Sequence, residues 1–116
     1  MNLVERIDTV CLKVSDVNKV SQWYQEVLGL QEQYKENHYV ILSVGTSGVP
    51  LTLEKGSTET NENTAYPIFF SSNIEHTFNV LTENGVKVTE IQKDGLNTFF
   101  NFCDLDGNKL QICYWE

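Results

Sequence analysis

The sequence predicts an α+β fold in which two tandem β-α-β-β-β modules form a curved mixed sheet, shaped as a cup, with the helices outside. Two observations predict it: strand-like and helix-like segments occur in the same order twice within 116 residues, and the second copy ends in a strong hairpin signal. That length allows one compact core but not two unrelated domains. We expect a single domain over residues 1–116, with module one at residues 3–55, a linker at residues 56–63 and module two at residues 64–116.

Module one begins with RIDTVCLKVS, residues 6–15, where apolar and polar residues alternate as in a strand with one packed face. Asp16 can then cap a helix whose apolar positions recur at helical spacing, and Gly29 supplies its left-handed stop. Three further strands are predicted over residues 30–36, 38–44 and 49–55.

Module two follows a linker that contains no large apolar residue. A strand over residues 65–71 leads to a helix that Ser72 or Asn73 can cap and that Gly85 ends. Three more strands are predicted over residues 86–92, 96–103 and 109–115.

The final hairpin is predicted from two apolar runs within residues 99–114, FFNFCDLDGNKLQICY. The Asp106-Gly107 step between them favours the positive φ of a tight turn. In the second run Leu110 and Ile112 alternate with Gln111 and Cys113, so one set packs in the core. The other set, mixing polar groups with aromatic neighbours, is typical of a cavity lining.

Helix boundaries indicate that one module was duplicated. Val17 and Ile74 start the two helices 57 residues apart, and the stop glycines Gly29 and Gly85 are 56 apart. Neither half can close a core of its own, so we expect a shared one. Its expected members are Val10, Leu12, Val14, Tyr24, Leu28, Leu53, Phe69, Phe78, Leu81, Leu110 and Ile112.

Composition excludes several classes of function. The net charge of −8 disfavours nucleic acid and anionic membranes as partners and favours cationic or neutral ligands. No apolar stretch has the roughly 20 residues of a membrane span, and the first residues lack a signal peptide's pattern, so we expect a cytoplasmic protein. Cys11, Cys103 and Cys113 lack metal or disulfide spacing and are expected to be free thiols.

Two segments resemble the vicinal-oxygen-chelate superfamily. IDTVCLKVSDVNKVSQWYQEVLGL is similar to its opening, in which a strand ending in Val-x-Asp leads to a helix ending in Leu-Gly-Leu. FCDLDGNKLQI is similar to its closing hairpin, Phe-x-Asp-Pro-Asp-Gly-Asn, with Leu105 in place of the proline. The resemblance covers nearly the whole chain and implies the cup fold and a homodimer. It leaves the activity open, because the superfamily includes glyoxalase I, extradiol dioxygenases, fosfomycin-resistance transferases and bleomycin-binding proteins.

The resemblance also implies where a divalent metal would be held, at Thr9, Glu54, Tyr66 and Gln111. Metal-dependent relatives have His or Glu, then Glu, His and Glu, so only Glu54 matches. Hydroxyl groups and a neutral amide are poor ligands for a catalytic cation. We therefore expect no metal cofactor, and Glu54 is the one candidate ligand if there is any.

The alternation of each strand predicts a face that binds a small organic ligand, cationic or aromatic. Its expected residues are Thr9, Cys11, Glu54, Tyr66, Ile68, Phe70, Phe102, Gln111 and Cys113, with Lys13 and Thr52 beside them and Phe100 as the alternative to Phe102.

Other readings stay open. No catalytic residue is assigned, since His38 and His76 lack a triad or ligand pattern. The alternative function is a metal-dependent lyase or dioxygenase that holds its divalent metal through Glu54 and non-standard partners. A domain without any ligand is the third possibility.

Overall fold

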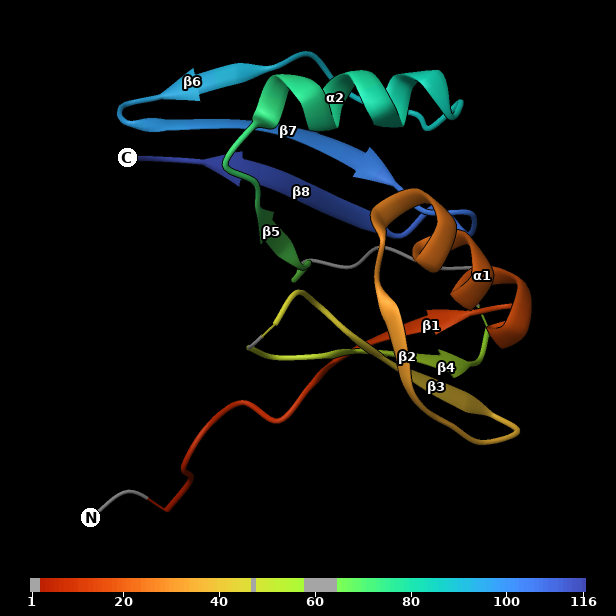
Figure 1. Ribbon diagram of the computed structural model, residues 1–116. Coiled ribbons are helices and arrows are strands. Elements are labelled where there is room, and N and C mark those ends of the chain that lie inside the picture. Colours follow the sequence, from red (N-terminus) through yellow and green to blue (C-terminus); the bar gives the residue numbers. More distant parts are fainter. Residues whose placement is uncertain (1–2, 47, 58–64) are drawn as a thin grey trace. The chain divides into compact units, whose positions relative to one another are not determined.

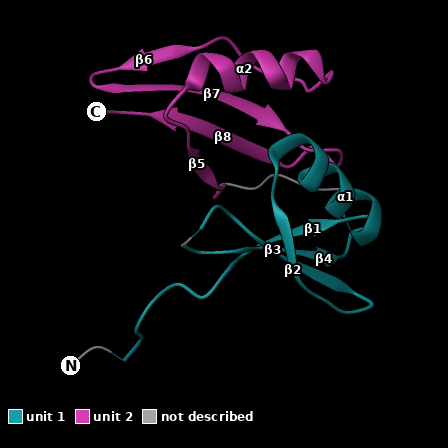
Figure 2. Cartoon of the chain, in the orientation of Figure 1, with its two compact units in different colours: residues 1–59 teal, residues 60–116 magenta. Residues whose placement is uncertain are grey.

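The computed structural model describes residues 3–46, 48–57 and 65–116 (Figure 1). They belong to two compact units, residues 1–59 and 60–116 (Figure 2). Most of the linker expected at residues 56–63 lies outside the described residues. Within the described ranges, no helix is both long and apolar enough to span a membrane.

Unit 1 is one β-α-β-β-β module, and its sheet has the order β1-β4-β3-β2. Strand β1 runs parallel to β4, and the other neighbours are antiparallel. Helix α1 packs on β2, β3 and β4. The elements are β1 (Val10–Val14), α1 (Val17–Leu28), β2 (Gln31–Lys35), β3 (Tyr39–Ser43) and β4 (Leu51–Lys55).

Unit 2 repeats the module, with the equivalent sheet order β5-β8-β7-β6. Strand β5 is parallel to β8, and helix α2 packs on β7 and β8. The elements are β5 (Ile68–Phe70), α2 (Ile74–Glu83), β6 (Gln92–Asp94), β7 (Asn97–Cys103) and β8 (Lys109–Tyr114). The α+β fold of two tandem modules is therefore confirmed.

The strand expected over residues 86–92 is wrong in its position, because β6 starts only at Gln92. Upstream, the chain approaches β7 through a single bridge from Val88 to Phe102. Next to it, the Asn101 N–H donates to the Thr89 hydroxyl oxygen at 2.9 Å. Because this side chain takes up a donor of β7, the regular ladder begins only farther along.

The helix ends follow the capping residues. The Asp16 carboxylate accepts from the Lys19 N–H at 3.1 Å, and Gly29 closes α1 with φ 73°. Between the two caps considered for α2, the structure selects Asn73, whose side-chain oxygen accepts from the His76 N–H at 3.1 Å.

The core lies between each helix and the sheet that it covers. Most of the expected core residues are buried, but Val10 is 36% exposed and that assignment is wrong. It starts the edge strand β1, whereas α1 packs on the other three strands of the sheet. The fully buried side chains include Val14, Val20, Tyr24, Val40, Leu42, Leu51, Leu53, Leu81, Phe100, Phe102 and Leu110.

A carboxylate holds the closing hairpin between β7 and β8. Asp104 Oδ1 accepts from the N–H groups of Asp106 and Asn108, each at 2.9 Å, and its Oδ2 accepts from Asn108 Nδ2 at 2.9 Å. Both Asp104 and Asn108 are buried, and Gly107 adopts φ 81°. This network sets the turn without the proline that the family pattern carries.

Candidate functional site

Each sheet has one face covered by its helix and a second face turned away from it, which we call the open face. In unit 1, register places Cys11 beside Thr52 and Lys13 beside Glu54 on the open face. In unit 2, it places Ile68 beside Gln111 and Phe70 beside Cys113. These expected site residues therefore lie on the open faces of their own units.

Polar groups of the unit 1 open face satisfy one another. The hydroxyls of Thr9 and Thr52 are hydrogen-bonded at 2.8 Å, and the Thr9 hydroxyl also donates to the Pro50 carbonyl at 3.0 Å. The Lys13 ammonium forms an ion pair with the Glu54 carboxylate. The charge of Glu54 is therefore neutralised within the sheet.

An aromatic pair lies on neighbouring strands of unit 1. The rings of Tyr34 and Tyr39 are 6.0 Å apart between centroids, and His38 meets Tyr39 edge-on at 4.9 Å. The Tyr34 hydroxyl donates to Glu36, and this hydrogen bond, with the carboxylate's charge, raises the pKa of Tyr34 to about 12. His38 is thus in edge-on contact with the ring of Tyr39.

The open face of unit 2 is more apolar. Ile68 is 53% exposed and Phe70 is 54% exposed. The Lys109 ammonium lies over the Tyr66 ring, 4.0 Å from its centroid. Burial raises the pKa of the Cys113 thiol, so little thiolate forms at neutral pH.

An amide pair links the two central strands of the same face. Gln111 Nε2 donates to Asn101 Oδ1 at 2.9 Å. Gln111 is buried and Asn101 is half-buried. Asn101 was missed by the sequence reasoning, although it lies opposite Gln111 in the hairpin register.

Phe102 does not lie on the open face, which corrects the expected site. It is only 1% exposed, and Phe100 meets Phe78 of α2 edge-on at 5.3 Å. The antiparallel register pairs Phe102 with Leu110 and Phe100 with Ile112, so both phenylalanines share the core face. Phe99, opposite Cys113, is the β7 aromatic on the open face. The sequence held a usable signal: pairing residues outward from the Asp-Gly turn puts Phe102 opposite Leu110, on the core face.

Strand register also changes the match between the two halves. Ile68 follows Cys11 by the same 57 residues that separate the helix starts. Cys11 lies opposite Thr52, and Ile68 lies opposite Gln111. The counterpart of Gln111 in unit 1 is therefore Thr52, and the sequence offset that pointed to Glu54 is wrong by two residues.

The residues at the implied metal positions do not fit a divalent cation. In unit 1 the Thr9 hydroxyl is hydrogen-bonded to the Thr52 hydroxyl, and Glu54 already pairs with Lys13. In unit 2 they are an amide and a phenol ring with an ammonium group above it. Among the described residues, no three His, Cys, Asp or Glu side chains lie together as a metal centre requires.

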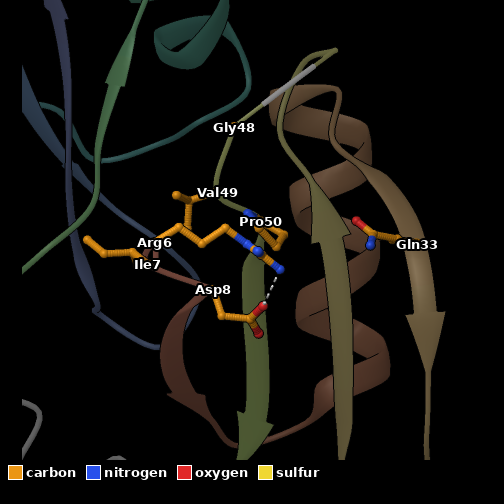
Figure 3. Close-up of a pocket in the computed structure, with 7 residues that line it drawn as sticks. All are labelled: Arg6, Ile7, Asp8, Gln33, Gly48, Val49 and Pro50. Carbon is orange, nitrogen blue, oxygen red and sulfur yellow. Dashed lines mark ion pairs between the residues drawn. The ribbon is translucent and has the colours of Figure 1, made fainter. Parts of the chain in front are cut away.

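Unit 1 also contains a hollow that the alternation patterns do not predict (Figure 3). Its volume is about 630 Å³, and an ion pair of 3.8 Å joins Arg6 and Asp8 on its wall. Gln33, one of its lining residues, lies where the pairing of β2 with β3 is irregular, between Glu32 and Tyr34. None of the expected site residues lines it; its walls are Arg6, Ile7, Asp8, Gln33, Gly48, Val49 and Pro50.

Comparison with protein families gives one match. The model described as the Glyoxalase/Bleomycin resistance protein/Dioxygenase superfamily matches residues 6–112. Among curated proteins, none matches the sequence significantly.

Solved structures of the same fold cover nearly the whole chain. A putative glyoxalase family protein from Bacillus anthracis has a TM-score of 0.84 at 17% identity and covers 100% of this chain and 99% of its own. The fosfomycin resistance protein FosX from Listeria monocytogenes, complexed with Mn(II) and sulfate, has a TM-score of 0.83 at 14% identity and covers 98% and 93%. The antibiotic-binding protein TnmS3 from Streptomyces sp. CB03234 has a TM-score of 0.80 at 14% identity and covers 100% of both chains. At these identities the likeness concerns the fold.

Proposed function

Because the chain belongs to the glyoxalase/bleomycin resistance protein/dioxygenase superfamily, we propose that it binds a small organic ligand without the superfamily's usual divalent metal. The observation that carries this proposal is the chemistry of the implied ligand positions. The side chains at these positions are neutral or already paired with another side chain. On the open face of unit 2, by contrast, aromatic and aliphatic side chains are exposed. The structural likeness to an antibiotic-binding protein, with a TM-score of 0.80, supports the view that this fold can bind a small molecule.

Apolar side chains provide most of the binding energy in this proposal. Ile68 and Phe70 each leave about half of their surface exposed, and a planar ligand would cover it. Burial of apolar area contributes roughly 25 cal/mol per Å², and an aromatic contact adds about 0.5–1.5 kcal/mol. Glu54 contributes little, because its carboxylate is partly exposed and paired with Lys13.

The ligand is expected to be either an aromatic molecule or an organic cation. The test is a thermal-shift screen with small organic cations and aromatic acids, each with and without a chelator. It compares the wild type with Tyr66→Ala and Glu54→Gln. We expect a ligand shift that survives chelator and Glu54→Gln and disappears in Tyr66→Ala.

The opposite pattern identifies the alternative function. A shift abolished both by chelator and by Glu54→Gln would indicate a metal-dependent lyase or dioxygenase, because loss of an anionic ligand weakens the metal itself. Stoichiometric nickel, zinc, iron or manganese in the purified protein would point the same way. Absence of any shift across the screen would contradict the binding proposal.

We also propose that the protein is a homodimer. Each four-stranded sheet ends in two edge strands, β1 and β2 in unit 1 and β5 and β6 in unit 2. Edge strands with unpaired backbone groups are usually covered by another chain or element. Sedimentation that gives a monomer at micromolar concentration would contradict this assembly.

A further inference from the structure

Lys109 is a basic residue of the unit 2 open face, at the start of β8. Its ammonium group contacts the Tyr66 ring, with 4.0 Å between the nitrogen and the ring centroid. Among the described residues, no carboxylate forms an ion pair with it. Within residues 65–116, the positive charge of Lys109 is therefore not neutralised by an acidic side chain.

Two acidic residues of this sheet, Asp104 and Asp94, are engaged or distant. Asp104, in the turn before Lys109, accepts three hydrogen bonds within the hairpin. Asp94 lies opposite Asn97, at the far end of β7 from Cys103, which is opposite Lys109. That separation is about 20 Å along the strand.

This arrangement decides the charge of the ligand. An organic cation attracted by the Tyr66 ring would meet the Lys109 ammonium already placed there, and like charges repel. A carboxylate would instead form a charge-assisted hydrogen bond with Lys109. The amino group of Asn101, whose carbonyl oxygen is used by Gln111, is a further donor on the same face.

The rest of the face suits an aromatic body. Ile68 and Phe70 are half-exposed on β5, and Phe70 lies in contact with Tyr114 and Trp115 at centroid distances of 5.9 and 5.6 Å. Flat apolar surface next to one cation and one amide matches a ring that carries a single anionic group.

We propose that the open face of unit 2 binds an aromatic carboxylate, and that Lys109 is the residue that selects its charge. This inference rests on the proposed function and narrows it from two ligand classes to one. It also runs against the net charge of −8, which by itself favours cations. Contact with one ammonium group acts at short range, whereas the overall field is screened within about 10 Å at 0.1 M salt.

The test uses three probes that share a ring and differ in charge: 2-naphthoate, 2-naphthamide and 2-naphthylmethylamine. Dissociation constants are measured by calorimetry for the wild type, Lys109→Gln, Lys109→Arg and Lys93→Gln. Lys93 is the matched control, because it is an exposed lysine of β6 in the same unit, and it lies opposite Thr98 on the other face.

We expect naphthoate to bind the wild type about tenfold more tightly than the amide or the amine, as one charge-assisted contact predicts. Lys109→Gln should remove this preference, whereas Lys109→Arg and Lys93→Gln should keep it. In the wild type, added salt should weaken naphthoate binding and leave amide binding unchanged. This last measurement needs no variant and holds if Lys109→Gln fails to fold.

The two proposals fail differently. If the amine binds as tightly as naphthoate, or if naphthoate binding ignores both Lys109→Gln and salt, the inference about Lys109 is overturned and ligand binding stands. If none of the three probes binds the wild type, the proposed function is contradicted, and the inference falls with it.

Discussion

The two units share a topology and differ on their open faces. Both have the parallel pair and helix of a β-α-β-β-β module, with buried aliphatic residues beneath each helix. On the open face of unit 1, polar side chains pair with one another, as Thr9 does with Thr52 and Lys13 with Glu54. On that of unit 2, Ile68 and Phe70 are exposed and Lys109 has no acidic partner among the described residues.

The difference shows which part of a duplicated module is constrained. Side chains under a helix must fill a dense core, so both copies keep apolar residues there. An open face carries no such requirement and can change its chemistry without loss of the fold. A family resemblance therefore predicts the core between helix and sheet better than it predicts which ligand the open face binds.

The largest expected effect tests the helix side of each unit. Leu53 in unit 1 and Leu110 in unit 2 are both 0% exposed, so truncation of either to Ala should cost about 2–5 kcal/mol of unfolding free energy. Denaturant unfolding measures it. Ile68→Ala, on the open face, should change stability by less than about 0.5 kcal/mol. A cost for Ile68→Ala as large as that for Leu110→Ala would mean that the face is packed in the native protein.

A second prediction concerns the hairpin of unit 2. Asp104→Ala leaves donors of the buried Asn108 without their acceptor, which should cost about 1–3 kcal/mol. Leu105→Ala, in the same turn, is the control because Leu105 is 49% exposed and should have little effect. Equal stability of both variants, again by denaturant unfolding, would show that the carboxylate network does not hold the turn.

The smallest effect compares one thiol from each unit. Cys11 is exposed, whereas burial raises the pKa of Cys113, so iodoacetamide should label Cys11 first at neutral pH. Mass spectrometry of single-thiol variants follows the rates. Labelling of Cys113 should accelerate only when the pH rises above the pKa of an ordinary cysteine.

The same pKa shift has a defined sign for stability. Unfolding restores the ordinary pKa of Cys113, so the unfolded chain loses its proton first, and stability declines as the pH rises above that value. Labelling of Cys113 as fast as Cys11 at neutral pH would contradict the burial of the thiol.

The fold could be predicted because its signals are local. Asp16, Gly29 and the Asp-Gly turn act within a few residues of their place in the sequence, and the structure uses all three. The same signals recur in the second half of the sequence, and they predicted the second module.

The site was harder to predict because it depends on register between distant strands. The helix offset could not reveal that β1 meets β4 two residues out of step with the pairing of β5 and β8, so that Thr52 and not Glu54 corresponds to Gln111. Phe102 was assigned to the wrong face because its register with β8, opposite Leu110, was not worked out. The hollow at Arg6 and Gln33 includes a residue at a local irregularity of β2, which no alternation pattern encodes.

The closing hairpin also has a consequence for the order of folding. Strands β7 and β8 meet across one short turn, whereas β5 and β8 pair Ile68 with Gln111 and must close a long loop first. Loop-closure entropy makes the hairpin the earlier structure in the transition state. Asp104→Ala should therefore slow refolding, while Phe69→Ala in β5 should mainly accelerate unfolding.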